Sequence, residues 1–213
     1  MKLRIIFLVV ILSVCPLIPS AFSLSYKAFK ILNQGKEAIN NQKYDVAIPA
    51  FTAVLSEDPK EPEALLGRAN AYAAVGDFQK AFNDLNQLIE INPKDAKAYL
   101  GRGFVYLRSQ NPVDAIADYS KYIELAPSDV EGFRHRGFAY LLKGDYEKSL
   151  ADYAHVLEEK PEDKETYVNR AVVYFMLKQY DKSWNDVYAA LERGESFDPK
   201  FLEDLKKQSG REK

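Results

Sequence analysis

The chain has 213 residues, enough for one ordinary domain or one short solenoid. Hydrophobic residues make up 47% of it and charged residues 28%, which is typical of a folded protein and excludes an intrinsically disordered one. The net charge is −2, so the chain lacks the basic excess that nucleic-acid binders usually carry. We therefore expect no nucleic-acid partner.

Residues 1–23 differ in composition from the rest of the chain. Lys2 and Arg4 give a basic start, and the following run from Ile5 to Val14 is almost wholly apolar. Ala21 and Ser23 then place small residues just before a cleavage point after Ser23. This order is typical of a secretory signal peptide. We predict a signal peptide over 1–23, a short lead-in over 24–27, and export to the periplasm or out of the cell.

Two alternatives would keep the protein at a membrane. The apolar run is shorter than the roughly 20 residues that span a bilayer, so a retained anchor is the weaker interpretation. Leu12 to Cys15 resembles a lipoprotein cleavage box, but Val14 stands where that box has a small residue. We expect membrane attachment only if Cys15 is lipidated or the signal is retained. Cleavage after Ser23 would leave a mature chain without cysteine, which needs no disulfide.

An internal repeat of 34 residues runs through most of the chain. It is marked by prolines at equal spacing: Pro59, Pro93, Pro127 and Pro161. The predicted units are 28–61, 62–95, 96–129, 130–163 and 164–197. The eighth position of each unit is small (Gly35, Ala69, Gly103, Gly137, Ala171), and so is the twentieth (Ala47, Ala81, Ala115, Ser149, Ser183). Small residues at these two positions let two helices approach closely, so each unit is predicted to be a helix pair.

The segment after the fifth unit reads as one further helix. Asp198 and Pro199 form a helix start, and Phe201, Leu202 and Leu205 fall on one face. We predict a capping helix over 198–208, which covers the last apolar face of the array, and a frayed tail over 209–213. The prediction for the whole chain is eleven helices and no strand.

The period, the small columns, the central turns and the closing prolines together resemble the tetratricopeptide repeat. The resemblance covers residues 28 to about 195 and implies an all-α, right-handed α-solenoid of five helix pairs. An ordinary helical bundle would not produce one unbroken period.

Four of the units share an arginine in the first helix and an aspartate 16 residues later. They are Arg68 with Asp84, Arg102 with Asp118, Arg136 with Asp152, and Arg170 with Asp186. The first unit has neither residue, so the two vary together within a unit. We predict an ion pair between the two helices of each of these four units. The alternative is that the arginines form a row of positive charges that binds a ligand.

The sequence shows no catalytic constellation. His135 and His155 lie in different predicted helices, and no Cys, His and carboxylate cluster has metal-ligand spacing. No glycine-rich phosphate loop or nucleophile elbow is present. We predict that the protein is not an enzyme and binds neither cofactor nor metal. His135 is the more interesting histidine, because a groove position could make its charge respond to pH.

The family resemblance implies that the first helices line a concave groove that holds partner segments. Carried over position by position, the candidate partner-binding residues are Leu66, Asn70, Leu100, Phe104, Arg108, Arg134, His135, Phe138, Asn169 and Val172. The family's clamp for a C-terminal carboxylate is absent, since its positions hold Leu32, Lys36, Gly67, Lys97 and Gly101. The groove is instead apolar and aromatic, with a shallow bay expected at Gly67, Gly101, Ala73 and Ala74.

These observations predict a non-catalytic protein–protein interaction module of the cell envelope: a scaffold, adaptor or assembly factor that holds a protein or peptide segment in its groove. The alternative is a structural protein whose array self-associates into an oligomer.

Overall fold

The computed structural model describes residues 24–211, and the predicted signal peptide and Cys15 lie outside this range. The described chain contains eleven helices and no strand. They are α1 (Tyr26–Asn40), α2 (Tyr44–Glu57), α3 (Pro62–Ala74), α4 (Phe78–Ile91), α5 (Ala96–Arg108), α6 (Pro112–Leu125), α7 (Val130–Lys143), α8 (Tyr146–Glu159), α9 (Lys164–Met176), α10 (Tyr180–Glu192) and α11 (Pro199–Ser209). The predicted all-α solenoid is confirmed.

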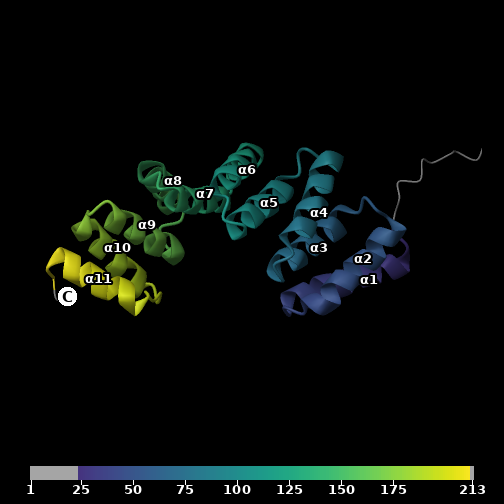
Figure 1. Ribbon diagram of the computed structural model, residues 1–213, viewed down its shortest axis with the longest axis horizontal. Coiled ribbons are helices and arrows are strands. Elements are labelled where there is room, and N and C mark those ends of the chain that lie inside the picture. Colours follow the sequence, from purple (N-terminus) through teal and green to yellow (C-terminus); the bar gives the residue numbers. More distant parts are fainter. Residues whose placement is uncertain (1–23, 212–213) are drawn as a thin grey trace, which may run out of the picture.

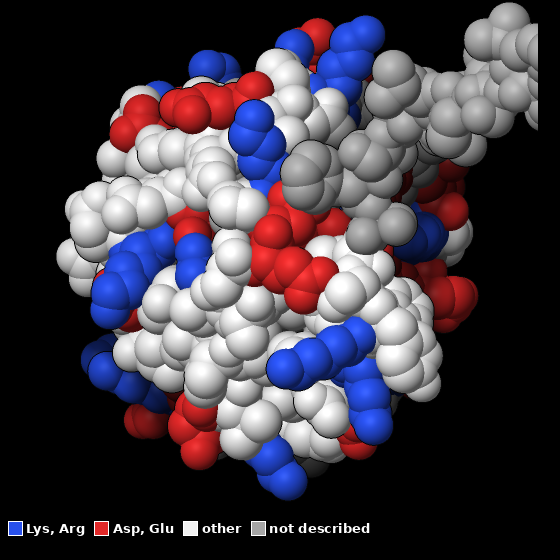
Figure 2. Space-filling view, turned by 90° about the vertical axis from the view of Figure 1, so that its right-hand side faces the viewer, with Lys and Arg blue, Asp and Glu red and all other residues white. Residues whose placement is uncertain are grey.

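The helices follow one another along an arch, in the order of the sequence (Figure 1). Each odd-numbered helix from α1 to α9 packs on the even-numbered helix that follows it, and each pair packs on the next. The odd-numbered helices form the inner row. On the face seen at the α1 end, positive and negative side chains are scattered around uncharged surface (Figure 2).

A left-handed residue separates the two helices of every unit. The residue has a φ between 56° and 88° in each case: Gln42, Gly76, Gln110, Gly144 and Lys178. In the third unit, the N–H groups of Gln110 and Asn111 donate to the carbonyls of Leu107 (3.0 Å) and Tyr106 (2.8 Å). This is the Schellman closure of a helix, and it repeats with the 34-residue period.

Small residues of the inner helices lie against large residues of the outer helices. A Cβ added to Gly103 would come within 2.7 Å of the Tyr119 ring, and one added to Gly137 within 2.8 Å of the Tyr153 ring. The glycines at the eighth position are therefore required by the aromatic residues that cover them. Where that position is alanine, as at Ala69, the neighbour in the same apolar cluster is the smaller Leu85.

The predicted ion pairs within the units are confirmed. In the third unit, Nε and Nη2 of Arg102 donate to the two carboxylate oxygens of Asp118, each over 2.8 Å. The same two-point contact joins the other three predicted pairs. Arg102 Nη1 also donates to Asn86 Oδ1 of the preceding unit, over 2.8 Å, so the arginine links two units.

Different contacts stabilise the first and the last helix of the array. The first helix begins at Tyr26, two residues before the predicted first unit, because the Ser25 side chain accepts the N–H of Ala28. At the other end, α11 starts after Asp198 as predicted and buries Leu205 completely. The prediction of a frayed tail from Ser209 is wrong for that residue, because the Trp184 indole N–H donates to its hydroxyl over 3.0 Å.

Candidate partner-binding groove

Each inner helix carries the residues that face the groove at fixed intervals in the sequence. On α5 this face carries Lys97, Gly101, Phe104 and Arg108, at intervals of four, three and four residues. Such intervals return to the same side of an α-helix. The same positions on α7 are Glu131, His135, Phe138 and Leu142, so corresponding residues of α5 and α7 lie one unit apart.

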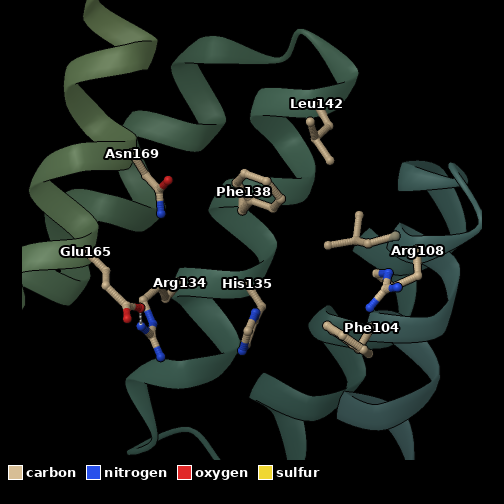
Figure 3. A pocket seen from close by; sticks show the side chains of 9 residues that line it. Phe104, Arg108, Arg134, His135, Phe138, Leu142, Glu165 and Asn169 are labelled. Atoms are coloured by element: carbon tan, nitrogen blue, oxygen red, sulfur yellow. Dashed lines mark hydrogen bonds and ion pairs between the residues drawn. The ribbon is translucent and has the colours of Figure 1, made fainter. Parts of the chain in front are cut away.

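The first hollow lies between α5, α7 and α9 and has a volume of about 400 Å³. Phe104 and Phe138 lie on its opposite sides, from α5 and α7, and Asn169 closes it from α9 (Figure 3). Six predicted groove residues line it together: Phe104, Arg108, Arg134, His135, Phe138 and Asn169. Its remaining lining residues are Leu107, Leu142 and Glu165.

The second hollow lies between α3, α5 and α7 and has a volume of about 420 Å³. It contains three further predicted residues, Leu66, Asn70 and Leu100. Phe104 and His135 line both hollows, so the two hollows adjoin along one groove. Phe104 lies between them and is 42% exposed, so it presents apolar surface to both hollows.

Two sequence expectations differ from the structure, and two lining residues were not expected. Val172 is half-buried on α9 and lines neither hollow. Ala73 does not line a bay, because it is 1% exposed and packs with Leu85 and Val105 in the core. Tyr122 and Asp129 do line the second hollow, although neither was foreseen. Tyr122 belongs to an outer helix and Asp129 precedes α7, so a rule based on inner-helix positions misses them.

The charged side chains of the groove are mostly neutralised within it. Arg134 donates from Nη2 to both carboxylate oxygens of Glu131, over 2.6 and 2.5 Å, and from Nη1 to Glu165 of the next unit. Lys36 forms an ion pair with Glu63. Arg108 forms no ion pair among the described residues; its guanidinium lies over the rings of Phe78 and Phe104, 6.0 and 5.8 Å from their centroids.

His135 is held in its uncharged form at neutral pH. Burial lowers the pKa of His135, and the nearby Arg134 charge lowers it further. Glu131 opposes this effect from 3.4 Å, without reversing it. The imidazole stacks on the Tyr119 ring at a centroid distance of 5.4 Å. In this form His135 contributes an uncharged aromatic surface to both hollows.

Other kinds of site were sought over the same part of the chain. Within residues 24–211, no group of three or more His, Cys, Asp or Glu side chains is placed to hold a metal ion. None of the eleven described helices has both the length and the apolar composition needed to cross a bilayer.

Stacked helix pairs of one repeat length, with hollows along the inner row, define an α-solenoid repeat protein. A sequence model described as tetratricopeptide repeat matches residues 32–89, 66–130 and 137–199. The chain therefore belongs to the tetratricopeptide-repeat family, whose members are generally non-catalytic modules for protein–protein interaction. No curated protein sequence matches it.

Several solved structures share the fold. MamA of Desulfovibrio magneticus RS-1, from residue 41 to its end, is 17% identical and aligns with a TM-score of 0.72, over 81% of this chain and 97% of that one. A thermophilic protein of the family from Thermus thermophilus is 22% identical, with a TM-score of 0.66 over 86% and 97%. YrrB, described as having an unusual peptide-binding site, is 18% identical, with a TM-score of 0.63 over 78% and 86%. At such identities the likeness concerns the fold.

Proposed function

We propose that the protein is an exported, non-catalytic interaction module that holds a segment of another protein in its inner groove. The observation that carries this proposal is Phe104, a 42% exposed aromatic residue between two adjoining hollows. Exposed apolar side chains of this size, gathered in a concave surface, are typical of contact sites.

The apolar surface continues from unit to unit. Phe104, Leu142 and Met176 are 42%, 54% and 49% exposed, and they lie on the consecutive inner helices α5, α7 and α9. Phe104 and Leu142 line the same hollow, so a segment laid across α5 and α7 would bury both side chains. Burial of apolar area is the main favourable term in protein association, so such a segment is a suitable occupant.

The location in the cell envelope rests on the composition of residues 1–23. A signal peptide removed after Ser23 gives a mature protein that begins at Leu24. The intact mass of protein purified from its native cells tests this directly. A lipid-bearing N-terminus at Cys15 would support the lipoprotein alternative, and a mass that still includes residues 1–23 would contradict export by cleavage.

The groove is tested by capture of partners from the native envelope with Phe104→Ala, followed by measurement of affinity for the purified partner. Truncation of an anchoring aromatic residue typically costs more than 1 kcal/mol, so we expect affinity to fall at least about fivefold. The matched control is Tyr188→Ala on the outer helix α10, because Tyr188 is 41% exposed. Equal losses in both variants would contradict groove binding.

The alternative is that the array mainly self-associates. The molar mass in dilute solution separates the two functions, because a monomer leaves the groove free for a different partner. A stable oligomer that Phe104→Ala dissociates would instead assign the same groove to a second copy of this chain.

A further inference from the structure

Arg108 differs from Arg134, the other arginine that lines the first hollow, because it forms no ion pair among the described residues. It is the last residue of α5, it is exposed, and it lines the first hollow. It also lines a smaller hollow, of about 280 Å³, whose other lining residues carry no charge. By contrast, the carboxylates of the groove hold Arg134 and Lys36 in ion pairs. Within the described part of the chain, Arg108 is thus a positive charge outside any ion pair, and Phe104, Leu107 and Leu142 line the same hollow.

Two aromatic rings lie beside the guanidinium. Phe78 is the first residue of the outer helix α4, and Phe104 lies one turn before Arg108 on α5. A guanidinium that lies over an aromatic ring can still offer the N–H donors on its edge to a planar acceptor. A carboxylate can accept two parallel hydrogen bonds from such an edge. Since Leu107 and Leu142 line the same hollow, the contact would be partly shielded from water and correspondingly stronger.

Lys97, the other groove cation outside an ion pair, is less suited to this role. It lines one hollow together with Asp129 and Glu131 and another together with Glu63, and these carboxylates would repel an incoming carboxylate. The first hollow contains one acidic side chain, Glu165, and that side chain is paired with Arg134. The charge pattern of the groove therefore favours a carboxylate at Arg108.

We propose that the groove recognises a partner segment in which an Asp or Glu side chain lies close to a large apolar side chain. The carboxylate binds the edge of Arg108, and the apolar side chain enters the hollow between Phe104 and Phe138. Arg108 and Phe104 line the same two hollows, so the acidic and apolar residues of the segment lie near each other. This inference rests on the proposed function and specifies its ligand.

Selection from a library of random peptides tests the inference without knowledge of the natural partner. The peptides are displayed within a loop, so that none has a free C-terminal carboxylate. Selection on the wild-type protein should enrich an acidic residue near an aromatic or leucine residue. Selection on Arg108→Gln should retain the apolar residue and lose the acidic one. The control Lys207→Gln, at an exposed lysine of α11 that lines neither hollow, should behave as wild type.

One enriched peptide then completes a double-mutant cycle. It is synthesised with both ends blocked, together with a version in which the acidic residue is replaced by its amide. The replacement should weaken binding to the wild-type protein about tenfold. It should leave binding to Arg108→Gln nearly unchanged, because that variant has already lost the charge pair.

The outcomes separate this inference from the function on which it rests. Peptides that depend on Phe104 but show no acidic preference would overturn the role of Arg108 and leave the interaction module intact. An equal loss on both proteins would also overturn it. A library that yields no peptide dependent on Phe104 would contradict the proposed function itself.

Discussion

The ion pair between Arg102 and Asp118 allows a quantitative test of how each unit is held together. Removing Arg102 leaves a carboxylate whose side chain is 7% exposed, without its two guanidinium donors. Removing Asp118 leaves an arginine whose side chain is 21% exposed and whose guanidinium still donates to Asn86. The stranded carboxylate is the more costly of the two, because it is less able to regain hydration.

We expect Arg102→Ala to lower the free energy of unfolding by about 3 kcal/mol and Asp118→Ala by about 2 kcal/mol. The double variant should cost at least about 1 kcal/mol less than the sum, since the second change removes a group that the first has already left unpaired. Urea unfolding followed by circular dichroism measures all three values, and an unchanged m-value verifies that the same transition is compared.

The surface pair Lys121–Glu124 provides the control. Its side chains are 38% and 67% exposed, and its loss should cost less than about 0.5 kcal/mol. Additive costs for Arg102 and Asp118, or a larger cost for removing the aspartate, would refute this account of the pair.

Three further predictions concern single positions. Gln110→Gly should raise the free energy of unfolding by about 0.5–1 kcal/mol, because Gln110 has a φ of 62°, and a loss of stability in urea would contradict this. Ala154→Ser should give Arg170 the hydroxyl that the preceding unit supplies to Arg136, for a net gain of about 0.5 kcal/mol after the helix-propensity cost; an unchanged urea midpoint would refute it. Because the folded-state pKa of His135 is lowered from 6.5, its contribution to stability is present above pH 6.5 and lost as the pH falls below it. His135→Gln should reduce this loss, and equal pH dependence of unfolding in the two proteins would contradict the prediction.

Much of the fold could be predicted because each unit is built from local patterns. Asp198 and Pro199 predict the start of α11, since capping depends on residues adjacent in sequence. The ion pairs could also be predicted, because arginine and aspartate vary together within a unit. The left-handed turns were harder to recognise where Gln42, Gln110 and Lys178 replace glycine, although they occupy the same position of the repeat.

The groove could be predicted in part. The family resemblance implied that Phe104, Arg108 and His135 face the groove, and the structure places them in adjoining hollows. The same rule placed Ala73 there, but neighbouring helices bury it. Spacing along one helix gives the direction of a side chain, whereas exposure depends on how closely the next helix packs.

The sequence by itself determined the repeat length, the helix pairs and the residues that join the two helices of each unit. These features depend on contacts within 34 residues, and the same contacts recur in each unit. Only the tertiary structure decided which charges remain without a partner. Glu165 reaches back to neutralise Arg134, 31 residues earlier, while Arg108 meets aromatic rings and no carboxylate. Such pairings depend on the distances between stacked units, and those distances are set by the packing of whole helices.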